Sequence, residues 1–188
     1  MAYGDANAVA MEIGEFEVLP VVEEIPVFCG VHGSDPRRRM WHFLQQVKAM
    51  GFSGVNNFPT HSIVDGNFRD ILEETGMGFY KEVEMVRIAS EMDLFSCVYV
   101  ATPEEAIQMA EVGADAIIAH VEIIEAGRKI NKDILFLAHG GPINTPDDVK
   151  VILANTDAHG FVGASSLERM AVESSLTALT QDFKSLKL

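Results

Sequence analysis

Two apolar segments of the sequence end in residues that could bind a small anion. The first is ILFLAHGGPI, residues 134–143, and the second is FVGASS, residues 161–166. Glycines leave backbone amides open to a ligand, and the second segment leads into a helical stretch whose free amides and dipole favour an anion. The candidate phosphate-binding residues are Gly140, Gly141, Gly163, Ser165 and Ser166. The alternative is that the glycines only form tight turns and that Ser165 only caps a helix.

Three of the six histidines lie where an apolar segment ends, and an imidazole there could polarise or protonate a substrate. They are His32, His120 and His139. A histidine at a strand end is nearly as often a structural hydrogen-bond donor, so both interpretations stay open. His42 lies on a helical stretch and His159 precedes a strand, and we interpret both as structural.

Acidic side chains in residues 73–84 could supply a general acid or base, or oxygen ligands for Mg²⁺. The candidates are Glu73, Glu74, Glu82 and Glu84. Most acids on helices are only solvated, but Glu73 and Glu74 precede the break Gly76-Met77-Gly78 and need not belong to a plain helix face. The sequence has no catalytic-triad spacing, P-loop or zinc-ligand spacing.

Six short apolar runs predict the buried strands that position these residues. Most are continuously apolar, which is typical of parallel strands covered on both faces. They are Ile25–Val31, Ser53–Phe58, Leu94–Val100, Ala114–Val121, Ile134–His139 and Gly160–Ala164. In parallel α/β folds the active site lies at the carboxyl ends of the strands, where the second run adds Asn57 to the candidates.

Helical signals alternate with these strands. Pro36, after Ser34 or Asp35, predicts one helix start, and Thr102 and Thr145 each begin a capping box. Further helices are predicted for Ala6 to about Glu24, Phe68–Glu74, Phe79–Met92 and Leu167–Leu188. The alternation is typical of a single α/β domain over residues 1–188. A (β/α)8 barrel and an open doubly wound sheet both fit, although a barrel would be incomplete with six strand–helix units.

Composition narrows the possible partners. The 188 residues are 48% apolar, which is enough for a folded core, and the net charge of −14 argues against nucleic acid or an anionic membrane. A local positive field could still bind a small anion, although we interpret Arg37, Arg38 and Arg39 as a solvated helix start. Neither a signal peptide nor a membrane-spanning run is expected. Cys29 and Cys97 lie in apolar runs and predict inert thiols in the cytoplasm.

The sequence resembles the phosphoenolpyruvate hydrolase-like TIM-barrel family over almost its whole length. The matching segments, in order, are GFSGVNNFPT, DGNFRDILEETGMGF, EVEM, GADAIIAH, AHGGPI and HGFVGASSLER. The family also forms the C-terminal domain of Tm-1-like ATP-binding proteins in plants. The resemblance implies a TIM barrel related to the phosphoenolpyruvate mutase and isocitrate lyase group. By this resemblance, sixteen residues of this chain match positions in the family's motifs. They are Asn57, Phe58, Pro59, Glu73, Glu74, Gly76, Gly78, Glu84, His120, His139, Gly140, Gly141, Gly163, Ser165, Ser166 and Glu168.

The chain also departs from this family. It lacks the segment that holds the first two strands, and most of a loop after His120. His61 and Ser62 replace an apolar pair that usually follows FPT, and Ala138 stands where a cysteine is usual. We therefore expect an incomplete barrel whose edge strands pair with another copy, which would make a homo-oligomer.

The resemblance implies an enzyme that acts on a small phosphorylated or carboxylated substrate such as phosphoenolpyruvate. The substrate phosphate would lie on the amides of the glycine and serine segments, and Asn57 would be a further ligand. His139 or His120 would polarise the substrate, and Glu73, Glu74 or Glu84 would act as a base or hold Mg²⁺. One alternative is a non-catalytic sensing or protein-binding module. Another is a truncated gene product without activity.

Overall fold

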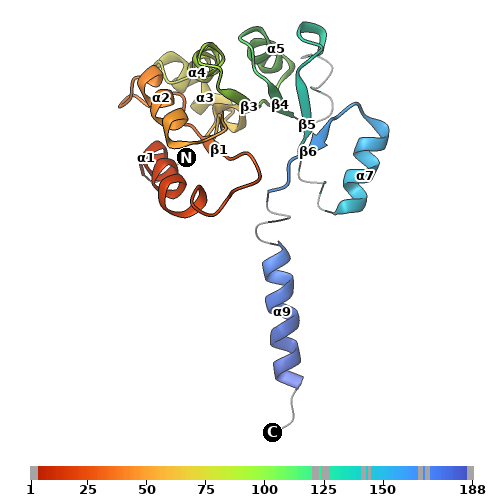
Figure 1. Ribbon diagram of the computed structural model, residues 1–188. Coiled ribbons are helices and arrows are strands. Elements are labelled where there is room, and N and C mark those ends of the chain that lie inside the picture. The colour runs from red at the N-terminus through yellow and green to blue at the C-terminus, as the bar shows by residue number, and fades with distance from the viewer. Residues whose placement is uncertain are drawn as a thin grey trace.

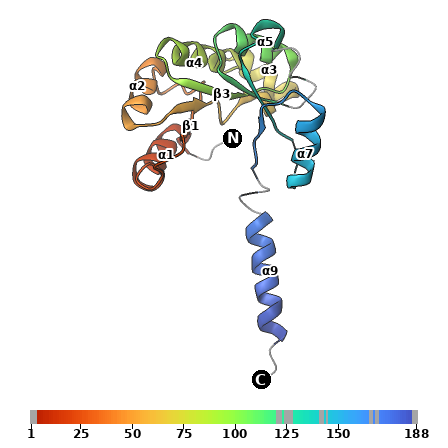
Figure 2. The same cartoon turned by 45° about the vertical axis from the view of Figure 1, so that its right-hand side comes forward.

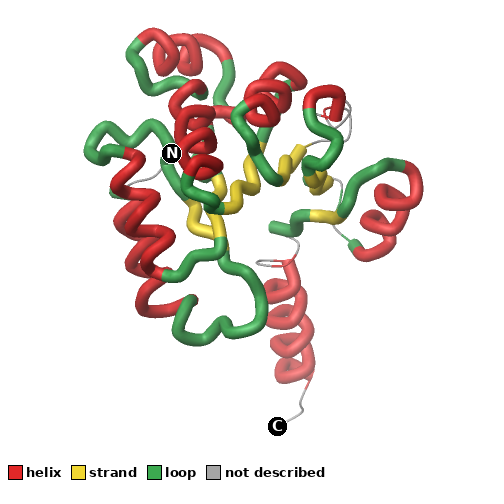
Figure 3. The backbone as a smooth tube through the Cα atoms, turned by 45° about the horizontal axis from the view of Figure 1, so that its top comes forward, coloured by secondary structure: helices red, strands yellow, loops and turns green. Residues whose placement is uncertain are grey.

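The computed structural model of the protein describes residues 4–119, 123, 128–140, 143, 145–164, 167 and 170–185. Six parallel strands pair side by side in chain order (Figure 1). They are β1 (Phe28–Gly30), β2 (Gly54–Asn56), β3 (Phe95–Tyr99), β4 (Ala116–Ala119), β5 (Leu135–Ala138) and β6 (Gly160–Phe161). In Figure 3 the strands form a curved row with helices on its outer side. The fold is therefore an α/β fold of the (β/α)8-barrel type, incomplete in the part of the chain that the structure describes.

Helices follow most of the strands along the chain. They are α1 (Ala6–Ile13), which continues as a π-helical turn (Gly14–Val18), α2 (Met40–Met50), a short 3₁₀ turn (His61–Ile63), α3 (Gly66–Glu74), α4 (Tyr80–Glu91), α5 (Pro103–Glu111), α7 (Pro146–Asn155) and α9 (Met170–Ser185). Figures 1 and 2 show that α9 extends away from the other elements. No helix among the described residues is long and apolar enough to cross a membrane.

The main core lies between the sheet and helices α2, α4 and α5. Val55, Val98, Ile117 and Phe136 come from the strands and have no more than 1% of their surface exposed. The helices contribute buried residues at helical spacing: Phe43, Leu44, Val47, Met85, Val86, Ala89, Ala106, Met109 and Ala110. Each fully buried aliphatic side chain of this kind stabilises the fold by about 1.5–3 kcal/mol.

The strand register brings the carboxyl ends of all six strands to one edge. Cys29 pairs with Val55, Ile117 with Phe136, and Ala138 with Phe161 in parallel. The six predicted strands and their parallel pairing are confirmed, although the strands are shorter than the apolar runs. The flanking residues of those runs belong to the connections that carry the candidate site.

The predicted helix start at Pro36 is wrong, because α2 begins at Met40. The Asp35 carboxylate accepts a hydrogen bond from the Arg37 amide at 2.8 Å and contacts Arg38 at 2.5 Å. Arg38 also binds both carboxylate oxygens of Asp5, at 2.7 and 2.9 Å. These contacts hold the segment after β1 in a turn, and the hydrogen bond from Arg38 is the main cause that lowers the pKa of Asp5 to about 2.

The first helix is also shorter than predicted. Its regular part ends at Ile13, and the π-helical turn reaches only Val18, whereas the sequence predicted a helix to about Glu24. Gly14 lies against Phe52, and an added Cβ would come within 2.2 Å of that ring. Pro20 follows, and it has no amide hydrogen with which to continue the helical hydrogen bonds. The missing donor explains why no regular helix extends past this turn.

Of the two predicted capping boxes, one is complete. Thr145 accepts from the Asp148 amide, and the Asp148 carboxylate accepts from the Thr145 amide at 2.8 Å. Thr102 accepts from the Glu105 amide at 3.2 Å, but the Glu105 carboxylate binds the Ala101 amide and Arg69 instead. The second box is therefore half formed, because Glu105 joins a buried ion pair.

Candidate functional site

His139 follows β5 and lies at the shared carboxyl edge of the sheet. Its backbone amide donates to the Ala119 carbonyl at 3.1 Å, and its Nδ1 lies 3.0 Å from the Val162 carbonyl oxygen. A carbonyl can only accept, so the hydrogen of the neutral ring is assigned to Nδ1. This leaves the Nε2 lone pair of a half-buried imidazole as a possible proton acceptor.

Three rings from separate segments meet at this edge. The rings of Tyr99 and His139 have centroids 5.4 Å apart at an angle of 74°, and those of Phe58 and Tyr99 are 5.8 Å apart. Phe58 is half exposed and precedes Pro59 in a cis peptide bond. Its carbonyl oxygen would lie 2.9 Å from a Cβ placed on Gly30, so the end of β1 accepts only glycine without a shift. The rings of Phe58 and Tyr99 therefore lie on one side of His139, and Tyr99 contacts it directly.

The glycine segments are described only in part. The Gly140 carbonyl accepts from the Ile143 amide at 3.0 Å, and a Cβ on Gly163 would lie 2.7 Å from Leu167. Gly140 thus accepts a backbone hydrogen bond from three residues further on, and Gly163 is closely packed; contact of either glycine with an anion stays a prediction. The candidates that fall outside the described residues are His120, Gly141, Ser165, Ser166 and Glu168.

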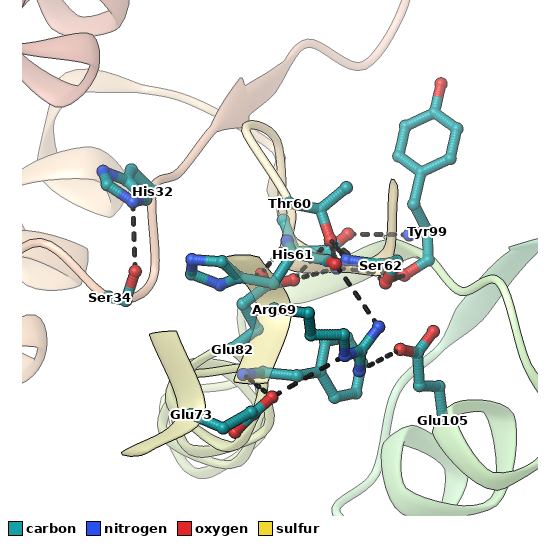
Figure 4. Close-up of polar contacts among 12 residues, drawn as sticks. His32, Ser34, Thr60, His61, Ser62, Arg69, Glu73, Glu82, Tyr99 and Glu105 are labelled. Atoms are coloured by element: carbon teal, nitrogen blue, oxygen red, sulfur yellow. Dashed lines mark hydrogen bonds and ion pairs between the residues drawn. The ribbon is translucent and has the colours of Figure 1, made fainter. Parts of the chain in front are cut away.

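Glu82, in the first turn of α4, is completely buried beside this edge. Its Oε2 accepts from Asn57 Nδ2 at 2.6 Å and from Thr60 Oγ1 at 2.7 Å. Its Oε1 accepts from the His61 amide at 2.6 Å. A buried carboxylate needs such partners, because desolvating it without them is costly. Glu82 thus organises the segment after β2 (Figure 4).

Asn57 is also completely buried, and its amide binds the next strand. Its Oδ1 accepts from the Tyr99 amide at 2.7 Å, and its Nδ2 donates to the Tyr99 carbonyl at 3.0 Å. The side chain thereby continues the pairing of β2 with β3 beyond the end of β2. Its proposed contact with a substrate stays a prediction, and the geometry favours a positioning role.

Two imidazoles lie near Glu82. His61 Nδ1 is 3.0 Å from Glu82 Oε1, but the geometry is not that of a hydrogen bond, and this buried nitrogen has no hydrogen-bond partner among the described residues. The His32 ring lies 6.2 Å from the His61 ring, and its Nε2 is 3.0 Å from Ser34 Oγ. Burial is the main cause that lowers the pKa of His32, and the His61 charge lowers it further.

Glu73, Glu74 and Glu84 do not meet in one site. Glu73 Oε1 accepts from the Phe79 amide at 2.9 Å, which caps the start of α4. Glu74 is exposed. Glu84 is exposed and binds Arg87 at 2.7 Å, and this hydrogen bond is the main cause that lowers the pKa of Glu84. Among the described residues no group of three or more His, Cys, Asp or Glu side chains could hold a metal, so Mg²⁺ binding stays a prediction.

Sequence reasoning named Glu82 among four candidate acids or bases and Mg²⁺ ligands, but did not predict that it is a buried carboxylate bound by neighbouring side chains. Its helical phase was the available signal: Glu82, Met85, Val86 and Ala89 lie at i, i+3, i+4 and i+7 and share the buried face of α4. It also missed the buried pair between Arg69 and Glu105, with a 2.6 Å contact across α3 and α5. No periodic signal pointed to that pair.

Comparison with known proteins gives a family match over nearly the whole chain. The model of the phosphoenolpyruvate hydrolase-like family matches residues 1–128 and 121–186. The two stretches overlap directly after His120, where the sequence predicted a shortened loop. Two proteins of Solanum lycopersicum, the ToMV susceptible protein tm-1(GCR26) and the ToMV resistance protein Tm-1(GCR237), are 44% and 43% identical over 213 residues.

The tomato alignments cover 100% of this chain but only 28% of each tomato protein. They extend over 213 positions against 188 residues, so this chain has gaps relative to those proteins. Among solved structures, the aldolase QR15 has a TM-score of 0.47 at 16% identity and covers 92% of this chain and 80% of its own. The YdjI aldolase of Escherichia coli K12 has a TM-score of 0.46 at 12% identity, and the match covers 79% of this chain and 57% of the aldolase.

Proposed function

This chain belongs to the phosphoenolpyruvate hydrolase-like family, and we propose that it binds and hydrolyses a small phosphorylated or carboxylated substrate at the carboxyl edge of its sheet. The observation that carries the proposal is the anchored imidazole of His139. Its Nδ1 is held by the Val162 carbonyl at 3.0 Å, which fixes the ring between the ends of β5 and β6. A fixed ring that leaves one nitrogen for chemistry is typical of a general base.

For phosphoenolpyruvate, hydrolysis needs a single group that accepts a proton and passes it on. A water oxygen forms a bond to phosphorus, and the bond from phosphorus to the enol oxygen breaks. One water proton stays on the released phosphate, and His139 Nε2 accepts the other and passes it to the methylene carbon. The products are pyruvate and phosphate. The family resemblance and the position of Gly140 and Gly163 after β5 and β6 support placing the phosphate beside His139.

The test compares His139→Asn with wild type. The asparagine amide nitrogen lies where Nδ1 lies, so this variant keeps a donor for the Val162 carbonyl and removes Nε2. We expect phosphate release from phosphoenolpyruvate to fall by about 10²- to 10⁴-fold. The melting temperature without ligand should stay close to that of wild type. His42→Asn, on the exposed face of α2, is the matched control.

Ligand binding is measured in the same experiment. Phosphoenolpyruvate at about 100 times its dissociation constant should stabilise the wild type by about 2.7 kcal/mol in a thermal melt. Repeating the assay with Mg²⁺ and with EDTA tests the predicted metal. Unchanged turnover in His139→Asn would contradict the role of this residue, and no thermal shift with phosphoenolpyruvate would contradict the substrate.

A second function is favoured by the names of two relatives. The tomato proteins are named for resistance and susceptibility to a virus, and this chain is 44% and 43% identical to them. On this proposal the chain is a non-catalytic binding module. Binding of phosphoenolpyruvate or inorganic phosphate without any phosphate release would support the module, whereas phosphate release that depends on His139 would exclude it.

A further inference from the structure

We infer that Glu82 is a positioning residue that, through Asn57, sets the contact between Tyr99 and His139. The inference rests on the proposed function of His139. It concerns a carboxylate that is completely buried and so acts on a substrate only through other groups. It also gives a role to the polar network that surrounds Glu82 at the end of β2.

The first step is the orientation of the Asn57 amide. Its Nδ2 has only two hydrogens but lies near three acceptors: Glu82 Oε2 at 2.6 Å, the Tyr99 carbonyl at 3.0 Å and Thr60 Oγ1 at 3.2 Å. Thr60 Oγ1 instead donates to Glu82 at 2.7 Å. The two hydrogens of Asn57 therefore go to Glu82 and Tyr99. The Glu82 carboxylate accepts here, so it holds the amide nitrogen in the position that the Tyr99 carbonyl also requires.

The second step runs from Asn57 to the rings. With Nδ2 fixed, Oδ1 accepts from the Tyr99 amide at 2.7 Å, so both backbone groups of Tyr99 are bound by one side chain. This sets the backbone of Tyr99 at the end of β3. In Figure 4 the Tyr99 ring points away from the Glu82 cluster. Its edge contact with His139 has a centroid distance of 5.4 Å.

The two residues after Thr60, His61 and Ser62, join the same network. The His61 amide donates to Glu82 at 2.6 Å, and Ser62 Oγ donates to the Tyr99 carbonyl at 3.3 Å. An apolar pair at these positions would keep the backbone contact but not the Ser62 bond. Ser62 therefore adds a further hydrogen bond between this network and the backbone of Tyr99.

Glutamine is the informative replacement for Glu82. Oε1 faces the His61 amide, and Oε2 faces donors from Asn57 and Thr60, so both oxygens meet donors. Whichever way a glutamine amide turns, its NH₂ group faces a donor. Glu82→Gln therefore disturbs the orientation of Asn57 while it keeps the volume of the side chain. Glu91→Gln, on the exposed end of the same helix, is the matched control.

The main readout is the NMR signal of the His139 ring protons, which sense the ring current of Tyr99 and need no ligand. In Glu82→Gln we expect this signal to shift, with a smaller shift in Ser62→Ala and none in Glu91→Gln. Turnover of phosphoenolpyruvate should fall by about 10- to 100-fold in Glu82→Gln, because small misplacements of reacting groups carry penalties of this size.

The outcomes separate this inference from the proposed function. An unshifted His139 signal in folded Glu82→Gln would overturn the inference, whatever the activity. If Glu82→Gln does not fold, the test is made with Ser62→Ala. An unshifted His139 signal in Ser62→Ala then overturns the inference. If the signal shifts as expected but the wild type neither binds nor hydrolyses phosphoenolpyruvate, the positioning role stands and the proposed function fails.

Discussion

At the scale of single residues, His32 is the imidazole whose protonation the fold disfavours. Burial is the largest cause that lowers its pKa from the ordinary value of 6.5, and the nearby His61 acts in the same direction. Asp35, Glu82 and Asp5 oppose the shift. Asn7, from α1, binds both the amide and the carbonyl of His32, at 2.9 and 3.2 Å, so the ring cannot easily move into solvent.

The lowered pKa of His32 predicts a loss of stability in mild acid. Below pH 6.5 the unfolded chain binds a proton at this position more readily than the folded chain, so the free energy of unfolding falls as the pH drops. The slope for one proton is at most about 1.4 kcal/mol per pH unit. Urea unfolding between pH 8 and pH 5 should show that His32→Gln loses less stability than the wild type. Parallel curves for the two proteins would contradict this, and His42→Gln serves as the control.

The two thiols show what residue type and context can predict. Burial raises the pKa of Cys29 to about 12, and burial with the charge of Asp115 raises that of Cys97 to about 11. Their position in apolar strand runs predicted inert thiols, and the raised pKa values agree with that prediction. The acids were harder to predict, because Glu82 and Glu84 differ by only two positions and have opposite environments. Only the helical phase of α4 separates a buried carboxylate from a solvated one.

At the scale of elements, the junction between α3 and α4 depends on one carboxylate and one glycine. Glu73 accepts from the Phe79 amide at the start of α4, and Arg69 Nε lies 3.9 Å from the same carboxylate. A Cβ on Gly78 would lie 1.8 Å from Glu73 Oε2. The carboxylate therefore occupies the space that a larger residue at position 78 would need.

This packing predicts that Gly78→Ala and Glu73→Ala are not additive. Alanine at position 78 should push the Glu73 carboxylate from the Phe79 amide and cost about 1 kcal/mol of unfolding free energy, the typical worth of a helix cap. In a Glu73→Ala background the cap is already lost, so the same change should cost close to nothing. A double-mutant cycle by urea unfolding measures the difference. Equal costs in both backgrounds would show that the carboxylate does not block this space.

Helix boundaries show where local signals are sufficient. Thr145 begins a complete capping box as predicted, because all of its partners lie within three residues. Pro36 does not begin a helix, because Asp35 and Arg38 are bound by Asp5 and Asn7 from a distant part of the chain. A local pattern cannot include such partners. The same is true of Glu105, which pairs with Arg69 across the fold.

At the scale of the whole molecule, the alternation of parallel strands with helices was the most predictable feature. Continuously apolar runs that alternate with helical signals predict parallel strands, and sequential neighbours in such folds usually pair in space. The structure has this order, β1 to β6. Periodicity alone could not separate a barrel from a doubly wound sheet, because both place apolar strands under helices. The family resemblance made that distinction, and the curved row of strands agrees with it.

Helix α9 carries the last prediction. Its large apolar residues at 4-3-4 spacing, Val172, Leu176, Leu179 and Phe183, are each more than half exposed. Side chains this exposed add little packing, and an isolated helix of 16 residues is marginally stable in water. A variant that ends at Arg169 should therefore lose helical signal in circular dichroism, while its unfolding free energy changes by less than about 0.5 kcal/mol, as for surface changes.

A matched variant of the full chain carries Leu176→Ser and Phe183→Ser. Its unfolding free energy should equal that of the wild type, because these exposed side chains bury little apolar surface. A large loss of stability in either variant would mean that the apolar face of α9 is covered in solution. Sedimentation of the wild type over a range of concentrations then identifies the cover. An oligomer mass, or dissociation on dilution, would place α9 against a second copy and support the predicted homo-oligomer, whereas the mass of a single chain at every concentration would place α9 against its own chain.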